Sequence, residues 1–173
     1  MFKKILVATD GSQHAARAVD AASDLAARYD ADLVVLHVLL HGQPLGEVRK
    51  LAEIEYGVEF PPPPPPPAGL SGTGAAIVDD SKAIQALYRA IEVVGNKIVE
   101  QAAQVARDKG VRTVKPLIED GDTVQWILTC AERENVDLIV MGSRGLGSLS
   151  GLLLGSNSHK VSQLAKCALL TVK

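Results

Sequence analysis

Aromatic residues are scarce in this chain, because Phe, Trp and Tyr make up only 3% of its 173 residues. A folded core therefore has to be packed mainly with the small and branched side chains that dominate the 47% hydrophobic content. Cysteine is also scarce, since Cys130 and Cys167 are the only two and stand far apart. Two isolated thiols exclude a disulfide framework and a C-x-x-C redox motif, and they indicate the reducing environment of the cytoplasm.

The chain also lacks an excess of one charge and a long apolar run. Its 18 basic and 20 acidic residues leave a net charge of −2, which excludes the basic signature of a nucleic-acid-binding protein. The first apolar run stops at Thr9, too early for a leader peptide, and no stretch approaches the roughly 20 apolar residues of a membrane span. We expect a single domain over residues 1–173, with neither nucleic acid nor a membrane as its partner.

Apolar runs and helical patterns alternate along the chain, which predicts the α/β class. The first half predicts strands at Lys4–Ala8 and Asp32–Val38 and a helix at about Gln13–Tyr29. A strand, a helix and a second strand in this order predict a parallel pair joined by a right-handed crossover.

The second half predicts three more strands, at residues 111–118, 138–141 and Ala168–Val172. Pro116 indicates that the first of these is a sheet edge, because proline cannot donate to a ladder. Asp122 is the predicted N-cap of the helix that follows it. A long helix is expected from about residue 80 to residue 110, with its inward positions at Ile84, Leu87, Ile91, Val94, Ile98, Ala102 and Val105.

An insertion at about residues 42–80 separates the two halves. Residues 61–67 are seven prolines, which predict an extended polyproline II segment of about 22 Å at ~3.1 Å per residue. Residues 68–76 are rich in glycine and serine, a flexible composition. We interpret the segment as a solvated spacer, with docking into an aromatic groove as the alternative.

The strand at 138–141 runs into a loop with five glycines between residues 142 and 155. Such a loop exposes peptide N–H groups, because glycine permits positive φ angles and close approach to the backbone. Residues 155–158 read Gly-Ser-Asn-Ser and are typical of a helix N-terminus, where free N–H groups and the helix dipole favour anions. The pattern predicts a phosphate site.

Other site classes fit this sequence poorly. The Walker loop does not fit, because Ser148 stands where its lysine is needed. The dinucleotide fingerprint G-x-G-x-x-G does not fit either, because Gly145-x-Gly147 is followed by Ser150 at the position of the third glycine. Residues 147–151 place leucine where a nucleophile elbow has serine. His37 and His41 leave a strand for a loop, so the helical i, i+4 geometry of a metal site does not apply to them.

The spacing Gly142-x2-Gly145-x9-Gly155-Ser156 is the motif by which the chain resembles the universal stress protein family, in its ATP-binding branch. Residues 5–12, 35–38 and Ala168–Val172 carry the same resemblance. It implies ATP or another adenine nucleotide as the ligand, and an adenine nucleotide alpha hydrolase-like fold with helices on both faces of an open parallel sheet. The residues alone permit the strand orders 3-2-1-4-5 and 2-1-3-4-5, and the resemblance favours the first.

In the order 3-2-1-4-5 the sheet reverses between its first and fourth strands, and ligands bind beyond the carboxyl ends of strands at such a point. Thr9 and Asp10 would then lie opposite Gly142 and Ser143. The resemblance implies twelve nucleotide-binding residues, with the base and ribose held by the earlier ones and the phosphates by the later ones: Ala8, Thr9, Asp10, Val38, Met141, Gly142, Arg144, Gly145, Gly155, Ser156, Asn157 and Ser158. Mg²⁺ would accompany the nucleotide, bound mainly by its phosphates and by water with little protein ligation.

The predicted function is that of a nucleotide-dependent stress-response module with little or no hydrolysis and no catalytic residues. A slow nucleotide hydrolase or phosphatase and a nucleotide-free scaffold are the alternatives. The apolar last strand would expose an unpaired edge, which two-fold pairing with a second copy removes, so a homodimer is expected. Bulk at Gly142 or Gly155 is expected to abolish binding while the fold survives.

Overall fold

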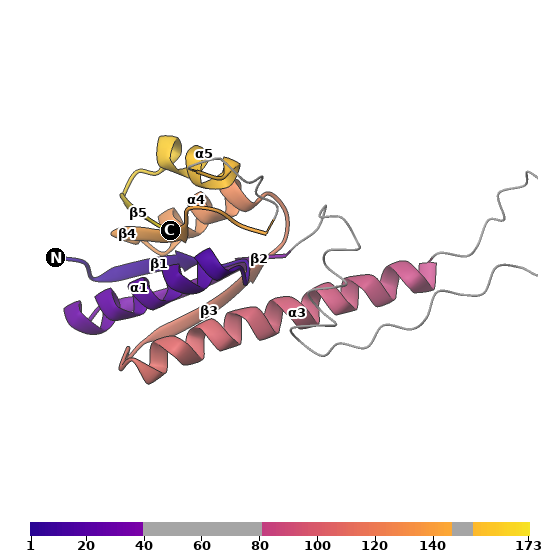
Figure 1. Ribbon diagram of the computed structural model, residues 1–173, viewed down its shortest axis with the longest axis horizontal. Helices are drawn as coiled ribbons and strands as arrows, with labels where there is room; N and C mark the ends of the chain where they lie inside the picture. The colour runs from indigo at the N-terminus through magenta and orange to yellow at the C-terminus, as the bar shows by residue number, and fades with distance from the viewer. Residues whose placement is uncertain (40–80, 147–153) are drawn as a thin grey trace, which may run out of the picture.

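Five parallel strands form one sheet in the order β3-β2-β1-β4-β5 (Figure 1). Every neighbouring pair is parallel. This confirms the predicted order 3-2-1-4-5 and excludes the alternative. The strands span Lys4–Ala8 (β1), Asp32–Val38 (β2), Val114–Glu119 (β3), Leu138–Gly142 (β4) and Ala168–Val172 (β5).

The computed structural model describes residues 1–39, 81–146 and 154–173, without the side chains of residues 81–84 and 86–87. The proline run at residues 61–67 and the middle of the glycine loop, with Gly147 and Gly151, therefore lie outside the described residues. In the part that is described, no helix is both long and apolar enough to cross a membrane.

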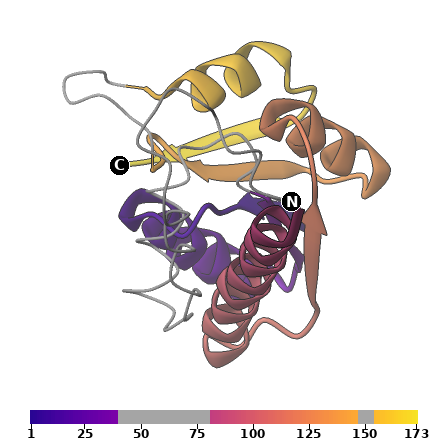
Figure 2. The ribbon, with the colours of Figure 1, turned by 90° about the vertical axis from the view of Figure 1, so that its right-hand side faces the viewer.

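Helices cover both faces of the sheet (Figure 2). Gln13–Tyr29 (α1) and Ser81–Asp108 (α3) lie on one face, and Thr123–Arg133 (α4) and Ser156–Leu164 (α5) lie on the other. Alternate residues of each central strand point to opposite faces, so that each face has its own core. Ile5 packs in the first core and Leu6 in the second, and both are fully buried.

The strands and helices begin and end close to the predicted positions, with differences around the end of α3. β3 begins at Val114 instead of residue 111. The reason is the helix cap: Gly110 has a φ of +88°, and the Val111 N–H donates back to Ala106 O at 3.1 Å. Val105 was predicted to face inward but is 37% exposed, and the neighbouring Ala106 is buried instead.

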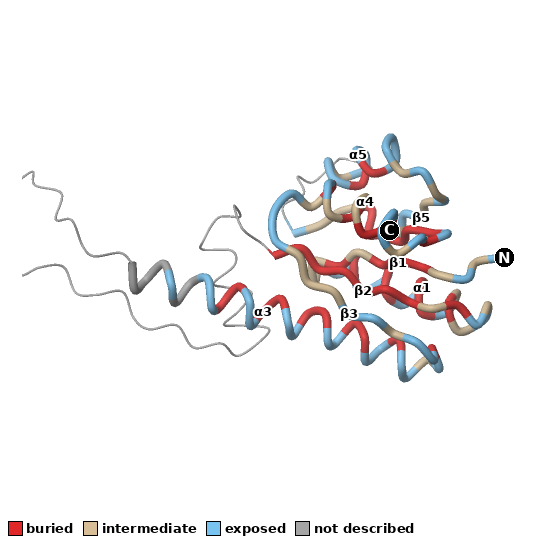
Figure 3. The backbone as a smooth tube through the Cα atoms, turned by 180° about the vertical axis from the view of Figure 1, so that it is seen from behind, coloured by how far each residue is buried: buried red, intermediate tan, exposed pale blue. Residues whose placement is uncertain are grey.

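The start of α3 is exposed, and farther along the helix buried and exposed residues alternate (Figure 3). The N-terminal part of the helix extends past the sheet, and Tyr88 is still 49% exposed. From Ala90 onward one side of the helix is buried, through Ile91, Val94, Ile98 and Ala102 as predicted. The helix contacts β2 and β3, and its packing on the sheet begins at Ile91, which lies against Ile118 of β3.

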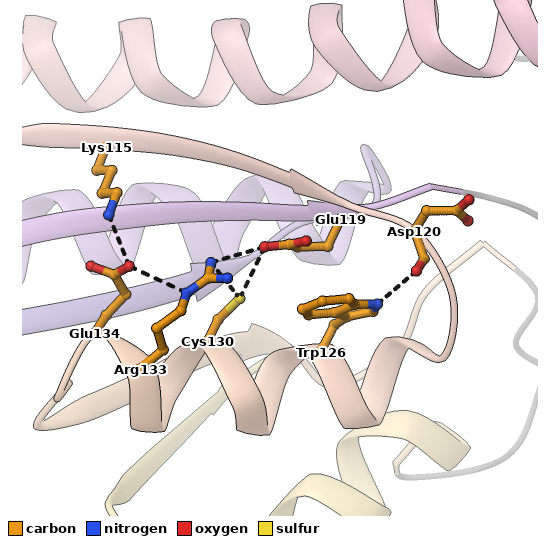
Figure 4. A network of polar contacts seen from close by, with 7 residues as sticks. All are labelled: Lys115, Glu119, Asp120, Trp126, Cys130, Arg133 and Glu134. Atoms are coloured by element: carbon orange, nitrogen blue, oxygen red, sulfur yellow. Dashed lines mark hydrogen bonds and ion pairs between the residues drawn. The ribbon is translucent and has the colours of Figure 1, made fainter.

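A polar network fixes α4 against the edge strand β3 (Figure 4). Lys115 Nζ donates to Glu134 Oε1 at 2.8 Å, and this hydrogen bond is the main cause that lowers the pKa of the Glu134 carboxyl. Arg133 donates to Glu119 Oε1 at 2.8 Å, and the Cys130 thiol lies 3.8 Å from the same oxygen. Pro116 lies within this strand, so its predicted edge position is confirmed.

The single tryptophan lies over the turn that follows β3. Its indole Nε1 donates to Asp120 O at 2.7 Å, and the residue remains partly exposed. Asp122 caps α4 by accepting from the Gln125 N–H at 2.8 Å, which confirms the predicted N-cap.

Candidate functional site

The sheet order reverses between β1 and β4, so the chain segments that leave these two strands diverge to opposite faces. β1 leads through Thr9 and Asp10 into α1, and β4 leads through Gly142 and Ser143 into the glycine loop. The Ser143 N–H donates to Val172 O at 2.6 Å, which extends the β4–β5 pairing beyond the strand. The predicted site residues therefore gather at one end of the sheet.

Asp10 joins the turn after β1 to the glycine loop. Its Oδ1 accepts from the Ser12 N–H and its Oδ2 from the Leu146 N–H, both at 3.0 Å. A Cβ atom at Gly145 would overlap Asp10 Oδ2, so any larger residue there would require the Asp10 carboxylate to move. Each carboxylate oxygen keeps accepting capacity for a further hydrogen bond.

Gly142 is enclosed by the protein itself. A Cβ atom there would lie 2.9 Å from His14 C and 3.0 Å from Ala15 N, both backbone atoms of α1. Backbone atoms of a packed helix cannot give way easily. Bulk at Gly142 is therefore expected to destabilise the packing of α1 on β4, a cost that the sequence alone did not indicate.

Gly155 is more open, since a Cβ atom there would meet its nearest neighbours at an ordinary 3.5 Å. It is the N-cap of α5, and no side chain in the described part of the chain caps the helix. Its own N–H donates to Ser143 O at 2.7 Å, which ties the start of the helix to the end of β4. The first N–H groups of α5 have no partner within the helix and carry the positive end of its dipole.

The three serine and asparagine residues at the start of α5 differ in their surroundings. Ser156 and Asn157 are exposed. Ser158 is 3% exposed, and its hydroxyl donates to Gly142 O at 2.8 Å. The hydroxyl proton is therefore used within the protein and is not available to a ligand. The backbone N–H of Ser158 is one of the first N–H groups of the helix, which have no acceptor within it.

Apolar side chains provide the floor of the same region. Val38 and Met141 are 7% and 6% exposed and belong to the core beneath α4 and α5, and Ala8 packs against that core. The three residues come from the ends of three adjacent strands. They offer a nonpolar contact next to the polar groups of Thr9 and Asp10.

Three buried side-chain atoms have no hydrogen-bond partner among the described residues: His37 Nε2, Ser143 Oγ and Arg144 Nε. All three lie on or beside the strand ends that form the site. Buried polar groups are normally paired, and a guanidinium and a hydroxyl in this position are donors suited to an anion. The predicted set included Arg144 but neither Ser143 nor His37.

Sequence signals for the two missed residues were present but weak. Ser143 directly follows a buried strand at the start of a glycine-rich loop, where small polar side chains are common. His37 is a polar residue within the apolar strand β2, a position that usually holds a valine or isoleucine. No group of three or more His, Cys, Asp or Glu side chains in the described part of the chain could hold a metal ion.

An open parallel sheet of this order, with helices on both faces, defines a doubly wound α/β protein, and folds of this class bind ligands at the reversal point of the strand order. The sequence model of the universal stress protein family matches residues 1–60 and 61–173. The chain therefore belongs to the universal stress protein family, as its resemblance implied.

Individual relatives agree with this assignment. The chain is 35% identical to universal stress protein YxiE of Bacillus subtilis over 173 residues, all of both chains. It is similar in fold to universal stress protein UspA from Lactobacillus plantarum, with a TM-score of 0.72 and 21% identity over 99% of this chain and 97% of that one. A universal stress protein in complex with cAMP has a TM-score of 0.61 and 22% identity, over 99% of this chain and 96% of that one.

Proposed function

We propose that this protein binds an adenine nucleotide, ATP in the first place, beyond the carboxyl ends of β1 and β4. The observation that carries the proposal is the N-terminus of α5 together with the buried Ser143 Oγ and Arg144 Nε, for which the described residues supply neither a side-chain cap nor a hydrogen-bond partner. Phosphate oxygens would satisfy all of these donors. A family member of the same fold has been solved with cAMP, which supports an adenine nucleotide as the ligand class.

In this proposal the two ends of the nucleotide meet different groups. Ala8, Val38 and Met141 offer apolar contacts to the base, and Thr9 and Asp10 offer hydrogen-bond acceptors to the ribose and base. The phosphates bind the loop and the start of α5, through Gly142, Arg144, Gly145, Gly155, Ser156, Asn157 and the Ser158 N–H. Mg²⁺ is held by the phosphates and water.

The bound nucleotide acts as a regulatory signal and undergoes little or no hydrolysis. No histidine ring in the described part of the chain bonds a serine hydroxyl or a cysteine thiol, so that part offers no activated nucleophile. Asp10 already connects the β1 turn to the loop through Leu146. Nucleotide that binds beside this contact changes the balance of loop conformations, which partner proteins distinguish.

The first experiment identifies the ligand. The purified protein is denatured by heat and the released small molecules are analysed, and the protein is then freed of nucleotide and titrated calorimetrically with ATP, AMP and cAMP. Arg144→Met should weaken ATP binding at least about tenfold, since a hydrogen bond to a charged group contributes ~1.5–3 kcal/mol.

Arg112→Met is the matched control, because Arg112 is an exposed arginine before β3, at the opposite end of the strands. It should leave ATP affinity unchanged. If the wild-type protein releases no nucleotide and none of the three produces heat, the proposed function is wrong. Rapid, Mg²⁺-dependent loss of ATP would instead support a nucleotide hydrolase.

We also propose that the protein acts in the cytoplasm as a homodimer. Both cysteines are free, which suits a reducing compartment. β5 is an edge of the sheet, and its Leu170 is 37% exposed. Pairing of two β5 strands about a two-fold axis would cover both features.

A further inference from the structure

The ring of His37 is buried beneath α3, with only 1% of the residue exposed. Its Nδ1 lies 2.8 Å from Thr9 O. A carbonyl oxygen only accepts hydrogen bonds, so Nδ1 carries the proton and Nε2 holds a lone pair. Burial lowers the pKa of His37 and outweighs the opposing effects of the Thr9 carbonyl and the Asp10 charge, so the ring is neutral near pH 7.

Helix α3 is shaped to cover this ring. A Cβ atom at Gly95 would lie 3.1 Å from His37 Cδ2 and 2.7 Å from Leu39 Cδ2. Glycine within a helix costs about 1 kcal/mol relative to alanine. Its presence in the middle of α3 is explained by the close approach of the helix backbone to these two side chains, while Ile91 packs against Leu39 one turn away.

The hydrogen bond from the ring continues the pairing of β1 with β2 beyond the strand end. The register of the two strands reaches Ala8 and Leu36, and the Thr9 N–H donates to Leu36 O at 2.9 Å. The bond that His37 makes to Thr9 O is the next one along. It fixes the orientation of the Thr9–Asp10 peptide plane at the start of the turn.

This bond determines the direction of the following N–H group. The peptide between Thr9 and Asp10 is planar and trans, so its C=O and N–H point to opposite sides. With the oxygen held toward His37, the Asp10 N–H points away from β2, and the Asp10 side chain starts from a fixed Cα position. Asp10 then reaches the Leu146 N–H across the site.

We infer that His37 is a positioning residue of the nucleotide site: through its Nδ1–H it fixes the Thr9–Asp10 peptide against which the nucleotide binds, and it is itself held by Gly95 of α3. The inference rests on the proposed function, since it assigns a role within that site. It predicts that a side chain with a donor at the δ position preserves binding, whatever its size.

His37→Asn and His37→Leu form the decisive pair, because the asparagine Nδ2 occupies the same position along the side chain as the histidine Nδ1, whereas leucine has no donor. ATP affinity measured by calorimetry should fall at least about tenfold in His37→Leu and stay within about threefold of wild type in His37→Asn. Ile91→Val serves as the control, because it loosens the contact between α3 and Leu39 without touching the donor. Its affinity should equal that of the wild type.

The outcomes separate the inference from the proposed function. If the wild type binds no adenine nucleotide, the proposed function fails. If it binds and His37→Leu binds equally well, or His37→Asn is as weak as His37→Leu, the positioning role is refuted.

A measurement on the unmodified protein covers the case in which a variant does not fold. A long-range ¹H–¹⁵N correlation spectrum distinguishes the two neutral tautomers of a histidine ring. The inference requires a neutral His37 protonated at Nδ1, both with and without ATP. A ring protonated at Nε2 in either state would overturn it.

Discussion

At the scale of single residues, the buried ring of His37 links the stability of the fold to pH. The pKa of His37 is lowered in the folded protein, whereas a histidine in the unfolded chain has a pKa of about 6.5. Near that pH the unfolded chain therefore binds a proton that the folded chain does not. The free energy of unfolding should therefore fall as the pH falls from about 7.5 to about 5.5. The pKa values of Glu134 and Asp137 are lowered in the folded protein, so their carboxylates stabilise the fold above the pKa of a free carboxyl group. That stabilisation is lost only as the pH falls through their lowered pKa values, below the range of the histidine effect.

Urea unfolding followed by the fluorescence of Trp126 measures this dependence, since it is the single tryptophan. In His37→Leu the loss of stability between these two pH values should be smaller than in the wild type. An equal loss in both proteins would show that the buried ring is not its cause.

At the scale of secondary-structure elements, two glycines of one motif serve different purposes. Gly142→Ala should lower the free energy of unfolding by about 1–3 kcal/mol, because its Cβ overlaps the backbone of α1. Gly155→Val should change it by at most about 1 kcal/mol, because the position is a helix N-cap with extended backbone and open surroundings. Yet Gly155→Val should abolish ATP binding, since its side chain would stand where the phosphates approach α5.

Urea unfolding and ATP titration of both variants test the distinction. Equal destabilisation of the two variants would show that Gly155 is also required for packing. A stable Gly155→Val protein with normal ATP affinity would show that the phosphates do not approach this end of the helix.

The glycine motif predicts the position of the loop but not the contacts of its glycines. The glycine spacing predicted a loop at the right place, because a high glycine content disfavours a helix in any context. It could not show that Gly142 faces α1 and Gly145 faces Asp10, since these contacts form only when β1 and β4 become neighbours. Likewise, β2 was predicted correctly from its apolar run, but the partner of the His37 ring depends on the register between β1 and β2.

At the scale of the whole molecule, the residues and the right-handed crossover rule left two strand orders open, and the family resemblance favoured the order 3-2-1-4-5 that the sheet has. Pro116 predicted correctly that β3 is an edge of the sheet. The beginning of β3 was predicted three residues early, because Val111 is apolar and reads as strand. In the folded chain it is buried by the cap of α3 instead.

The exposed edge at β5 allows a sharp test of the proposed homodimer. Ala168 N and Val172 O bond toward β4, so the alternation of a strand turns the N–H groups of Leu169 and Thr171 outward. Thr171→Pro removes one outward donor and leaves the inward ladder intact, whereas Thr171→Val keeps the donor. Sedimentation at micromolar concentration should show dimers for the wild type and Thr171→Val, and monomers with unchanged circular dichroism for Thr171→Pro. A monomeric wild-type protein would refute the homodimer, and a dimeric Thr171→Pro protein would place its interface away from the β5 edge.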